Sequence, residues 1–186
     1  AAVYFVLRTP PEKAAHAAWL EATAVRDAAQ TAPDRAEEHL EKAATLFAAV
    51  KDTYPSTRTA RIAASNLEEV RRVLDALARL KEEARTATAD RTEQEIQDAF
   101  VRLNRIASVV HPVVAKRAAD VEELLHLSRT ARSERQLAAV REEAEKHARE
   151  RAFGEALRAW DRFQVPDYLY RQRADDERRD LEKRIG

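Results

Sequence analysis

The sequence predicts an all-α fold of about seven to eight helices, and three observations carry this prediction. Only two of the 186 residues are glycine, so the usual turn residues of β structure are scarce. Alanine, arginine, glutamate and leucine dominate, and all four are strong helix formers. Finally, Pro55, Pro112 and Pro166 each close a stretch whose apolar residues recur at helical spacing. The steps from one proline to the next are 57 and 54 residues, which predicts antiparallel helical hairpins stacked irregularly on one another.

The first part of the chain predicts three helices. One covers residues 12–29, where alanines at three- and four-residue spacing would let a neighbouring helix approach closely. The next begins near Pro33, whose fixed φ suits a first helical turn, and ends at about Thr53. The third covers about residues 57–86. The apolar positions behind these predictions are Ala14, Ala17, Ala18, Leu20, Ala24, Val25, Ala28, Leu40, Ala43, Ala44, Phe47, Val50, Ile62, Leu67, Val70, Val73, Leu74, Leu77 and Leu80.

Two helices are predicted on either side of Pro112. Thr92 and Glu95 match a capping box, in which the threonine hydroxyl and the glutamate each satisfy a free amide of the first turn. The helix that starts there should end at His111, and another should cover about residues 113–128. The side chains expected to face inward are Ile96, Phe100, Leu103, Ile106, Ala107, Val110, Val114, Ala118, Val121, Leu124, Leu125 and Leu127.

The last part of the chain predicts three more helices. Ser133 and Gln136 form a second capping-box pattern, which predicts a new helix start, with a break near Gly154. A further helix around Trp160 should end before Pro166. The final stretch, residues 167–185, has few large apolar side chains, as suits the terminal helix of a solenoid, whose outer face meets water.

The N-terminal residues 1–11 form an apolar segment ahead of a single predicted helical domain, residues 12–186. Methionine is absent, so Ala1 is not a retained translation start and the chain is a processed product, a fragment or an excerpt. The run is too short to span a bilayer, which needs about 20 residues, but it fits the exit end of a membrane anchor. The alternative is a short apolar arm that docks on its own protein. The membrane-proximal candidates are Val3, Tyr4, Phe5, Val6, Leu7 and Arg8.

Two segments resemble tetratricopeptide repeats. Residues 41–57, with alanines, an aromatic residue and a Tyr-Pro end, followed by alanines at 60, 63 and 64, are similar to the repeat unit of bacterial envelope scaffolds. Residues 152–160 resemble the turn and second helix of that unit. The proline spacing near 55 departs from the family's 34-residue period, so the likeness is to a divergent, short, TPR-like solenoid. The resemblance implies a concave surface that binds other proteins, and it favours a membrane-tethered location on the periplasmic side of a bacterial envelope over the cytoplasm.

The composition argues against several function classes. Lysine plus arginine and aspartate plus glutamate both number 33 and are interleaved, so there is no basic stripe for nucleic acid. There is no cysteine for disulfides or thiolate metal ligands, and two glycines cannot build a phosphate loop or a nucleophile elbow. Glu123 and His126 lie at di-iron spacing, but the second such motif is missing. We therefore expect no enzyme activity, cofactor, metal site or small-molecule substrate.

One short segment stands out as a contact site for partners. Tyr168, Leu169 and Tyr170 are consecutive bulky residues that cannot all face one side of a helix, and aromatic side chains are enriched at protein interfaces. We expect one or more to contact a partner, the alternative being a wedge between the last two helices. The resulting hypothesis is a non-catalytic scaffold or adaptor for protein–protein interaction. The alternatives are a structural subunit of a larger membrane assembly and, from another class, a helical-bundle metal-binding protein or enzyme.

Overall fold

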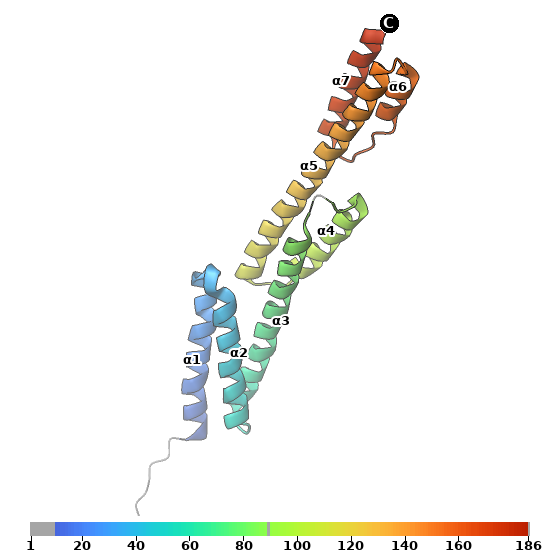
Figure 1. Ribbon diagram of the computed structural model, residues 1–186. Helices are drawn as coiled ribbons and strands as arrows, with labels where there is room; N and C mark the ends of the chain where they lie inside the picture. The colour runs from blue at the N-terminus through green and yellow to red at the C-terminus, as the bar shows by residue number, and fades with distance from the viewer. Residues whose placement is uncertain (1–9, 89, 186) are drawn as a thin grey trace, which may run out of the picture. The chain divides into compact units, whose positions relative to one another are not determined.

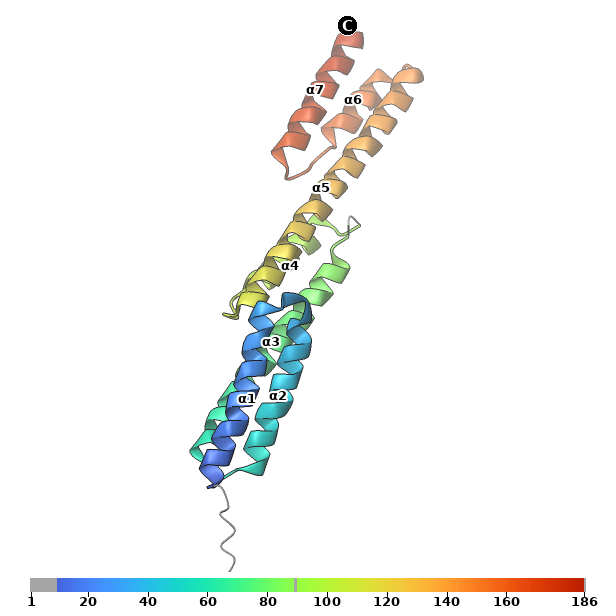
Figure 2. The same cartoon turned by 90° about the vertical axis from the view of Figure 1, so that its left-hand side faces the viewer.

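A computed structural model of the chain describes residues 10–88 and 90–185 (Figure 1 and Figure 2). Every regular element among these residues is helical: seven α-helices and one short 3-10 helix, with no strand. The all-α prediction is therefore confirmed. The elements are α1 (Pro11–Thr31), the 3-10 helix η1 (Pro33–Arg35), α2 (Ala36–Thr53), α3 (Arg58–Thr86), α4 (Glu93–Ala107), α5 (Pro112–Arg149), α6 (Phe153–Asp161) and α7 (Tyr168–Ile185).

All three prolines of the sequence argument lie at helix boundaries. Pro55 lies in the turn between α2 and α3, Pro112 is the first residue of α5, and Pro166 lies in the segment that precedes α7. Proline lacks the backbone N–H that a helix interior needs, but it fits a first turn or a connection. The prolines thus separate helices as the sequence predicts.

The chain divides into two compact units. The described part of the first comprises residues 10–86 and 100–122, and that of the second comprises residues 87–88, 90–99 and 123–185. Helices α4 and α5 each contribute one portion to either unit. The expectation of one domain over residues 12–186 stays a prediction.

The core of the first unit is built on heptad spacing. Helix α2 packs against both α1 and α3, and α1 also contacts α3. The buried residues of α2 alternate in steps of four and three, and those of α1 are alanines seven positions apart. Small side chains in α1 let its backbone approach α2 closely, while Phe47 and Leu40 supply the bulk between the helices. These buried residues are Ala15, Ala22, Ala29, Ala36, Leu40, Ala43, Phe47 and Val50.

Two helix starts are fixed by side-chain caps. Thr57 accepts a hydrogen bond from the N–H of Ala60 at 3.1 Å, which caps α3. At the start of α4, the Thr92 hydroxyl accepts the N–H of Glu95 at 3.2 Å, and the Glu95 carboxylate accepts the N–H of Thr92 at 2.6 Å. This reciprocal pair is the predicted capping box, and it satisfies two amides that the helix itself cannot.

The second unit has its own apolar core, which joins the C-terminal half of α5 to α6 and α7. Trp160 of α6 is its largest member. The helical break predicted near Gly154 is also found, because α5 ends at Arg149 and α6 begins at Phe153. The buried residues of this core are Leu137, Ala144, Ala156, Ala159, Trp160, Val165, Tyr170, Ala174 and Leu181.

The prediction that Ser133 starts a new helix is wrong. Helix α5 is continuous over 38 residues, and Ser133 is buried in its middle. Neither glycine nor proline interrupts this stretch, and it contacts the α3–α4 connection and the first residue of α4. Arg129 pairs with Glu93, and Arg132 donates to the carbonyl of Arg91 at 2.6 Å. These contacts join residues about 40 positions apart, so a local pattern does not reveal them.

Several apolar residues expected inside the core lie at the surface. Leu20 is 50% exposed and Ile62 41%, because the buried seams follow the heptad positions beside them, such as Ala22 and Ala63. On α5, Leu124 and Leu127 are exposed while Leu125 is fully buried. A further group, Val110 and Ala107, is also exposed, since Val110 lies beyond the end of α4 and Ala107 is its last residue.

Candidate functional site

The start of α7 separates three consecutive bulky side chains onto different faces. Tyr168 is 67% exposed and Leu169 65%, whereas Tyr170 is 7% exposed. A helix turns by about 100° per residue, so only one of three neighbours can point fully into a core. Two adjacent large apolar side chains therefore face solvent at the start of this helix. That they contact a partner stays a prediction.

Tyr170 anchors this segment to α5. Its hydroxyl donates a hydrogen bond to a carboxylate oxygen of Glu134 at 2.9 Å, and the guanidinium of Arg173 lies 5.7 Å from the ring centre. Burial raises the pKa of the Tyr170 phenol, and the negative Glu134 raises it further. The buried tyrosine thus fixes the helix end from which Tyr168 and Leu169 project.

A hollow of about 360 Å³ lies beside Tyr168 on α7. Its walls carry charges of both signs, Arg171 and Arg179 against Asp175 and Asp176. An exposed aromatic side chain next to a polar, mixed-charge rim has the composition of a protein contact patch.

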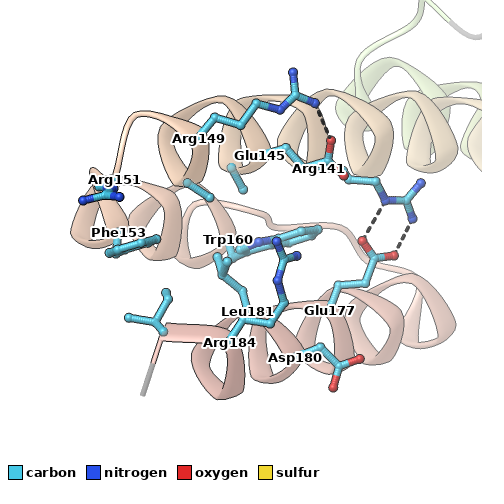
Figure 3. A pocket seen from close by; sticks show the side chains of 13 residues that line it. Arg141, Glu145, Arg149, Arg151, Phe153, Trp160, Glu177, Asp180, Leu181 and Arg184 are labelled. Carbon is cyan, nitrogen blue, oxygen red and sulfur yellow. Dashed lines mark hydrogen bonds and ion pairs between the residues drawn. The ribbon is translucent and has the colours of Figure 1, made fainter.

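A larger cavity of about 690 Å³ lies between α5 and α7 in the second unit, and we call it the α5–α7 groove (Figure 3). Its large apolar lining residues come from α6 and α7, and α5 contributes two alanines, Ala144 and Ala148. Figure 3 shows Trp160 in the middle of the groove, with Phe153 at one end. The large apolar lining residues are Phe153, Trp160, Leu181 and Ile185.

Charged side chains line the groove along both helices. Arg141 and Glu177 close one end, where the Arg141 Nε donates to Glu177 at 2.7 Å and a second guanidinium nitrogen makes a parallel bond (Figure 3). This hydrogen-bonded pairing raises the pKa of Arg141 above its ordinary value. On α5, Arg149 and Glu145 form a weaker, solvent-exposed pair at 3.3 Å.

Arg151 lies at the other end of the groove, in the connection from α5 to α6. Its φ is 60°, in the left-handed region that favours glycine. The N–H of Arg151 bonds the carbonyl of Ala148 at 3.1 Å, and that of Ala152 bonds the carbonyl of His147 at 2.9 Å. This is a Schellman ending for α5, with an arginine at the position that glycine usually occupies.

The other candidates from the sequence are not brought into a site. Val3, Tyr4, Phe5, Val6, Leu7 and Arg8 lie outside the described residues. Glu123 and His126 are exposed on α5. Within residues 10–88 and 90–185, no three histidine, aspartate or glutamate side chains gather so that they could hold a metal ion. Nor is any helix in those ranges both long enough and apolar enough to span a bilayer.

The groove was missed by sequence reasoning, although a signal was present. Residues 134 and 141 of α5 and residues 170 and 177 of α7 are each seven positions apart, which is the spacing of a helix seam. Heptad spacing of bonding side chains on both helices predicts a pairing between them. It does not reveal the parallel register that places one set opposite the other.

Comparison of the chain with family models, with curated proteins and with solved structures finds no match. The functional argument therefore depends on the residues and their geometry.

Proposed function

We propose that the chain is a non-catalytic helical scaffold or adaptor that mediates protein–protein interaction. The observation that carries this proposal is the pair Tyr168 and Leu169, both about two-thirds exposed at the anchored start of α7. Burying one large apolar side chain against a partner is worth roughly 1.5–3 kcal/mol, so two adjacent ones supply a contact centre. The mixed charges of the neighbouring hollow supply its rim.

Of the TPR-like resemblance, this proposal keeps the binding of partners through a helix surface and not a regular repeat. The similar segments fall on α2 with the start of α3, and on α6. Helix α3 has 29 residues and α5 has 38, which is long for a repeat that fits two helices into about 34 residues. The functional expectation from the resemblance, binding through a helix surface, is retained without a regular repeat.

A membrane tether at the N-terminal end and a place on the periplasmic side of a bacterial envelope complete the proposal. Both depend on the apolar run of residues 3–7 followed by Arg8, and on the resemblance. Fractionation of native cells tests them. Release of the chain by salt alone would contradict the tether, and recovery with detergent would support it.

Site-specific photo-crosslinking tests the scaffold function. A photoreactive phenylalanine derivative at position 168 should give discrete crosslinked bands, which mass spectrometry can identify. The matched control places the same group at Lys146, an exposed α5 residue that lines neither the groove nor the hollow. Equal labelling from both positions, or none from position 168, would overturn the proposal.

A structural subunit of a larger assembly is the second candidate function. Val110 favours it, because this large apolar residue is 97% exposed in the turn between α4 and α5 of the first unit. An end-to-end contact with a neighbour would remove this side chain from water, which is favourable. Crosslinks from position 110 that join two different assembly subunits would distinguish this candidate from an adaptor that binds only through α7.

A further inference from the structure

Two hydrogen-bonded side-chain pairs, which we call rungs, join α5 and α7, and the two helices run parallel. Glu134 bonds Tyr170, and Arg141 bonds Glu177; each pair is 36 residues apart. The second rung lies one heptad beyond the first on both helices. Figure 1 and Figure 2 show the two helices running in the same direction in this unit. The register therefore predicts a third rung one heptad further on.

The third rung is open. One heptad beyond Arg141 and Glu177 lie Ala148 and Arg184, so by this register an arginine falls opposite an alanine, where the preceding pairs have hydrogen-bonding partners. Both residues line the α5–α7 groove. In Figure 3, Arg184 extends from α7 towards Trp160. A small side chain at position 148 leaves space, and it gives the guanidinium of Arg184 no acidic partner on α5 at this level.

The charges of the groove do not cancel. Its three acidic residues are already paired: Glu145 with Arg149, Glu177 with Arg141 and Asp180 with Lys183. By contrast, Arg151 and Arg184 make no ion pair or side-chain hydrogen bond within the described part of the chain. Two unpaired guanidinium groups thus border an apolar floor. The chemistry that complements such a surface is an acidic group next to apolar side chains.

The backbone at Arg151 is consistent with a role for its side chain. A left-handed φ costs an arginine about 1–2 kcal/mol relative to its preferred regions, and glycine would adopt it freely. The side chain at this position does not serve helix termination, because the Schellman bonds use only backbone atoms. It does carry a charge to the rim of the groove, beside Phe153.

We infer that the α5–α7 groove binds an acidic amphipathic helix of a partner protein, with its apolar face on Phe153 and Ile185, beside the buried Trp160, and its carboxylates on Arg184 and Arg151. This deepens the proposed scaffold function and rests on it. Two parallel helices with heptad-spaced contacts form a trough that a further helix completes as a bundle. The lining of α5 runs from position 141 to 149, about 12 Å, which corresponds to just over two helical turns of the partner, and Arg151 lies two residues beyond it.

An unbiased peptide selection tests this inference. A display library of random peptides of about 14 residues is selected on the immobilised full chain. We expect enrichment of aspartate and glutamate together with leucine, isoleucine or phenylalanine at positions i, i+3 and i+4. The most enriched peptide is then titrated against the full chain in a Trp19→Phe background, so that the fluorescence of Trp160 reports occupancy of the groove.

Three variants test which groove residues the peptide contacts: two should weaken binding, and the third is a control. Arg184→Glu should weaken binding by about tenfold or more, because it replaces attraction by repulsion. Ala148→Glu should weaken binding similarly, since it fills the third rung and pairs with Arg184. The matched control is Lys146→Glu, a change from a basic to an acidic side chain at an exposed α5 residue outside the groove, which should leave the dissociation constant within about twofold. Circular dichroism confirms that each variant keeps its helical fold.

Several results of these experiments would contradict the inference. Selected peptides without acidic enrichment, no selected binder, or equal affinity for wild type and Ala148→Glu would overturn the inference. Saturation of the Trp160 signal by decanoate, with no peptide competition, would assign the groove to a small anionic amphiphile instead. Crosslinks from the photoreactive group at position 168 that persist, while the groove variants leave peptide binding unchanged, would retain the scaffold function and reject only the groove.

Discussion

Glu12, near the start of α1, caps the first turn of α3 through Thr59. Its carboxylate accepts hydrogen bonds from the backbone N–H groups of Arg58 and Thr59, each at 3.0 Å, and from the Thr59 hydroxyl at 2.5 Å. The residues are 46 and 47 positions apart. A carboxylate from one helix thus satisfies free amides of another and complements the positive end of its dipole.

We predict that Glu12→Gln destabilises the first unit in a pH-dependent way. The Thr59 hydroxyl, followed by the two backbone N–H groups, lowers the pKa of Glu12 in the folded chain. A lowered folded pKa gives stability that is fully present above the ordinary glutamate pKa of about 4.3 and is lost as the pH falls through the folded value. Thermal melts of both proteins from neutral to acid pH should therefore converge at the acid end.

The control for this prediction is Glu21→Gln. Glu21 is exposed on the same helix, and no ion pair or hydrogen bond of its side chain is found among the described residues. Its melting temperature should follow that of the wild type at every pH. A parallel loss in both variants would show that general charge, rather than the cap on α3, is responsible.

A second prediction concerns His111, in the connection between α4 and α5. Burial lowers its pKa, Glu69 raises it and Arg26 lowers it, with burial the largest cause. The Nδ1 atom is buried without a hydrogen-bond partner among the described residues. Because the unfolded chain binds this proton more readily, stability should be full above about pH 6.5 and should fall as the pH drops towards the folded value.

The variant His111→Gln should flatten the pH dependence below about pH 6.5. The measurement is the denaturation midpoint in urea as a function of pH. His39→Gln, at a half-buried histidine of α2, is the matched control and should leave the step caused by His111 in place. If the denaturation midpoint of His111→Gln still falls below about pH 6.5, a group other than His111 causes the pH dependence.

Local signals in the sequence predicted some helix boundaries correctly and others wrongly. The Thr92–Glu95 box is a true start because an irregular connection precedes it. The similar pattern at Ser133 lies inside α5, where Arg129 reaches the first residue of α4 and Arg132 reaches the segment before it. A capping pattern shows only that side chains able to cap the free amides of a helix start are present. Whether the chain breaks there depends on contacts between segments distant in sequence.

The candidate site, too, could be predicted from the sequence only in part. It could be predicted that the side chains of Tyr168, Leu169 and Tyr170 do not all lie on one face of the helix, because this follows from the helix period alone. The groove could not, because it requires that α5 and α7 be parallel and that position 148 lie opposite position 184. Neither helix contains that register in its own pattern. The arginine at position 151 likewise shows its left-handed backbone only once α5 has a defined end.

A third prediction compares a buried and an exposed apolar residue in the first unit. Phe47 is fully buried between helices, and Phe47→Ala should lower the free energy of unfolding by about 3–5 kcal/mol. Leu20 is half exposed on α1, and Leu20→Ala should change it by less than about 0.5 kcal/mol. Chemical denaturation measures both. Similar losses in the two variants would contradict the heptad seam described for this unit.

The last prediction uses two arginines that lie two positions apart with opposite backbone requirements. Arg151→Gly should raise the free energy of unfolding by up to about 1 kcal/mol, because glycine removes the cost of the left-handed φ although it frees the unfolded chain. Arg149→Gly should lower it by about 1 kcal/mol, since Arg149 is the last residue of α5 and glycine is a poor helix former. Equilibrium unfolding in guanidinium chloride distinguishes the two signs. A loss in both variants would show that the Arg151 side chain contributes more to folding than its backbone costs. A gain in Arg151→Gly, accompanied by weaker binding of the selected acidic peptide, would show that this position sacrifices stability for recognition.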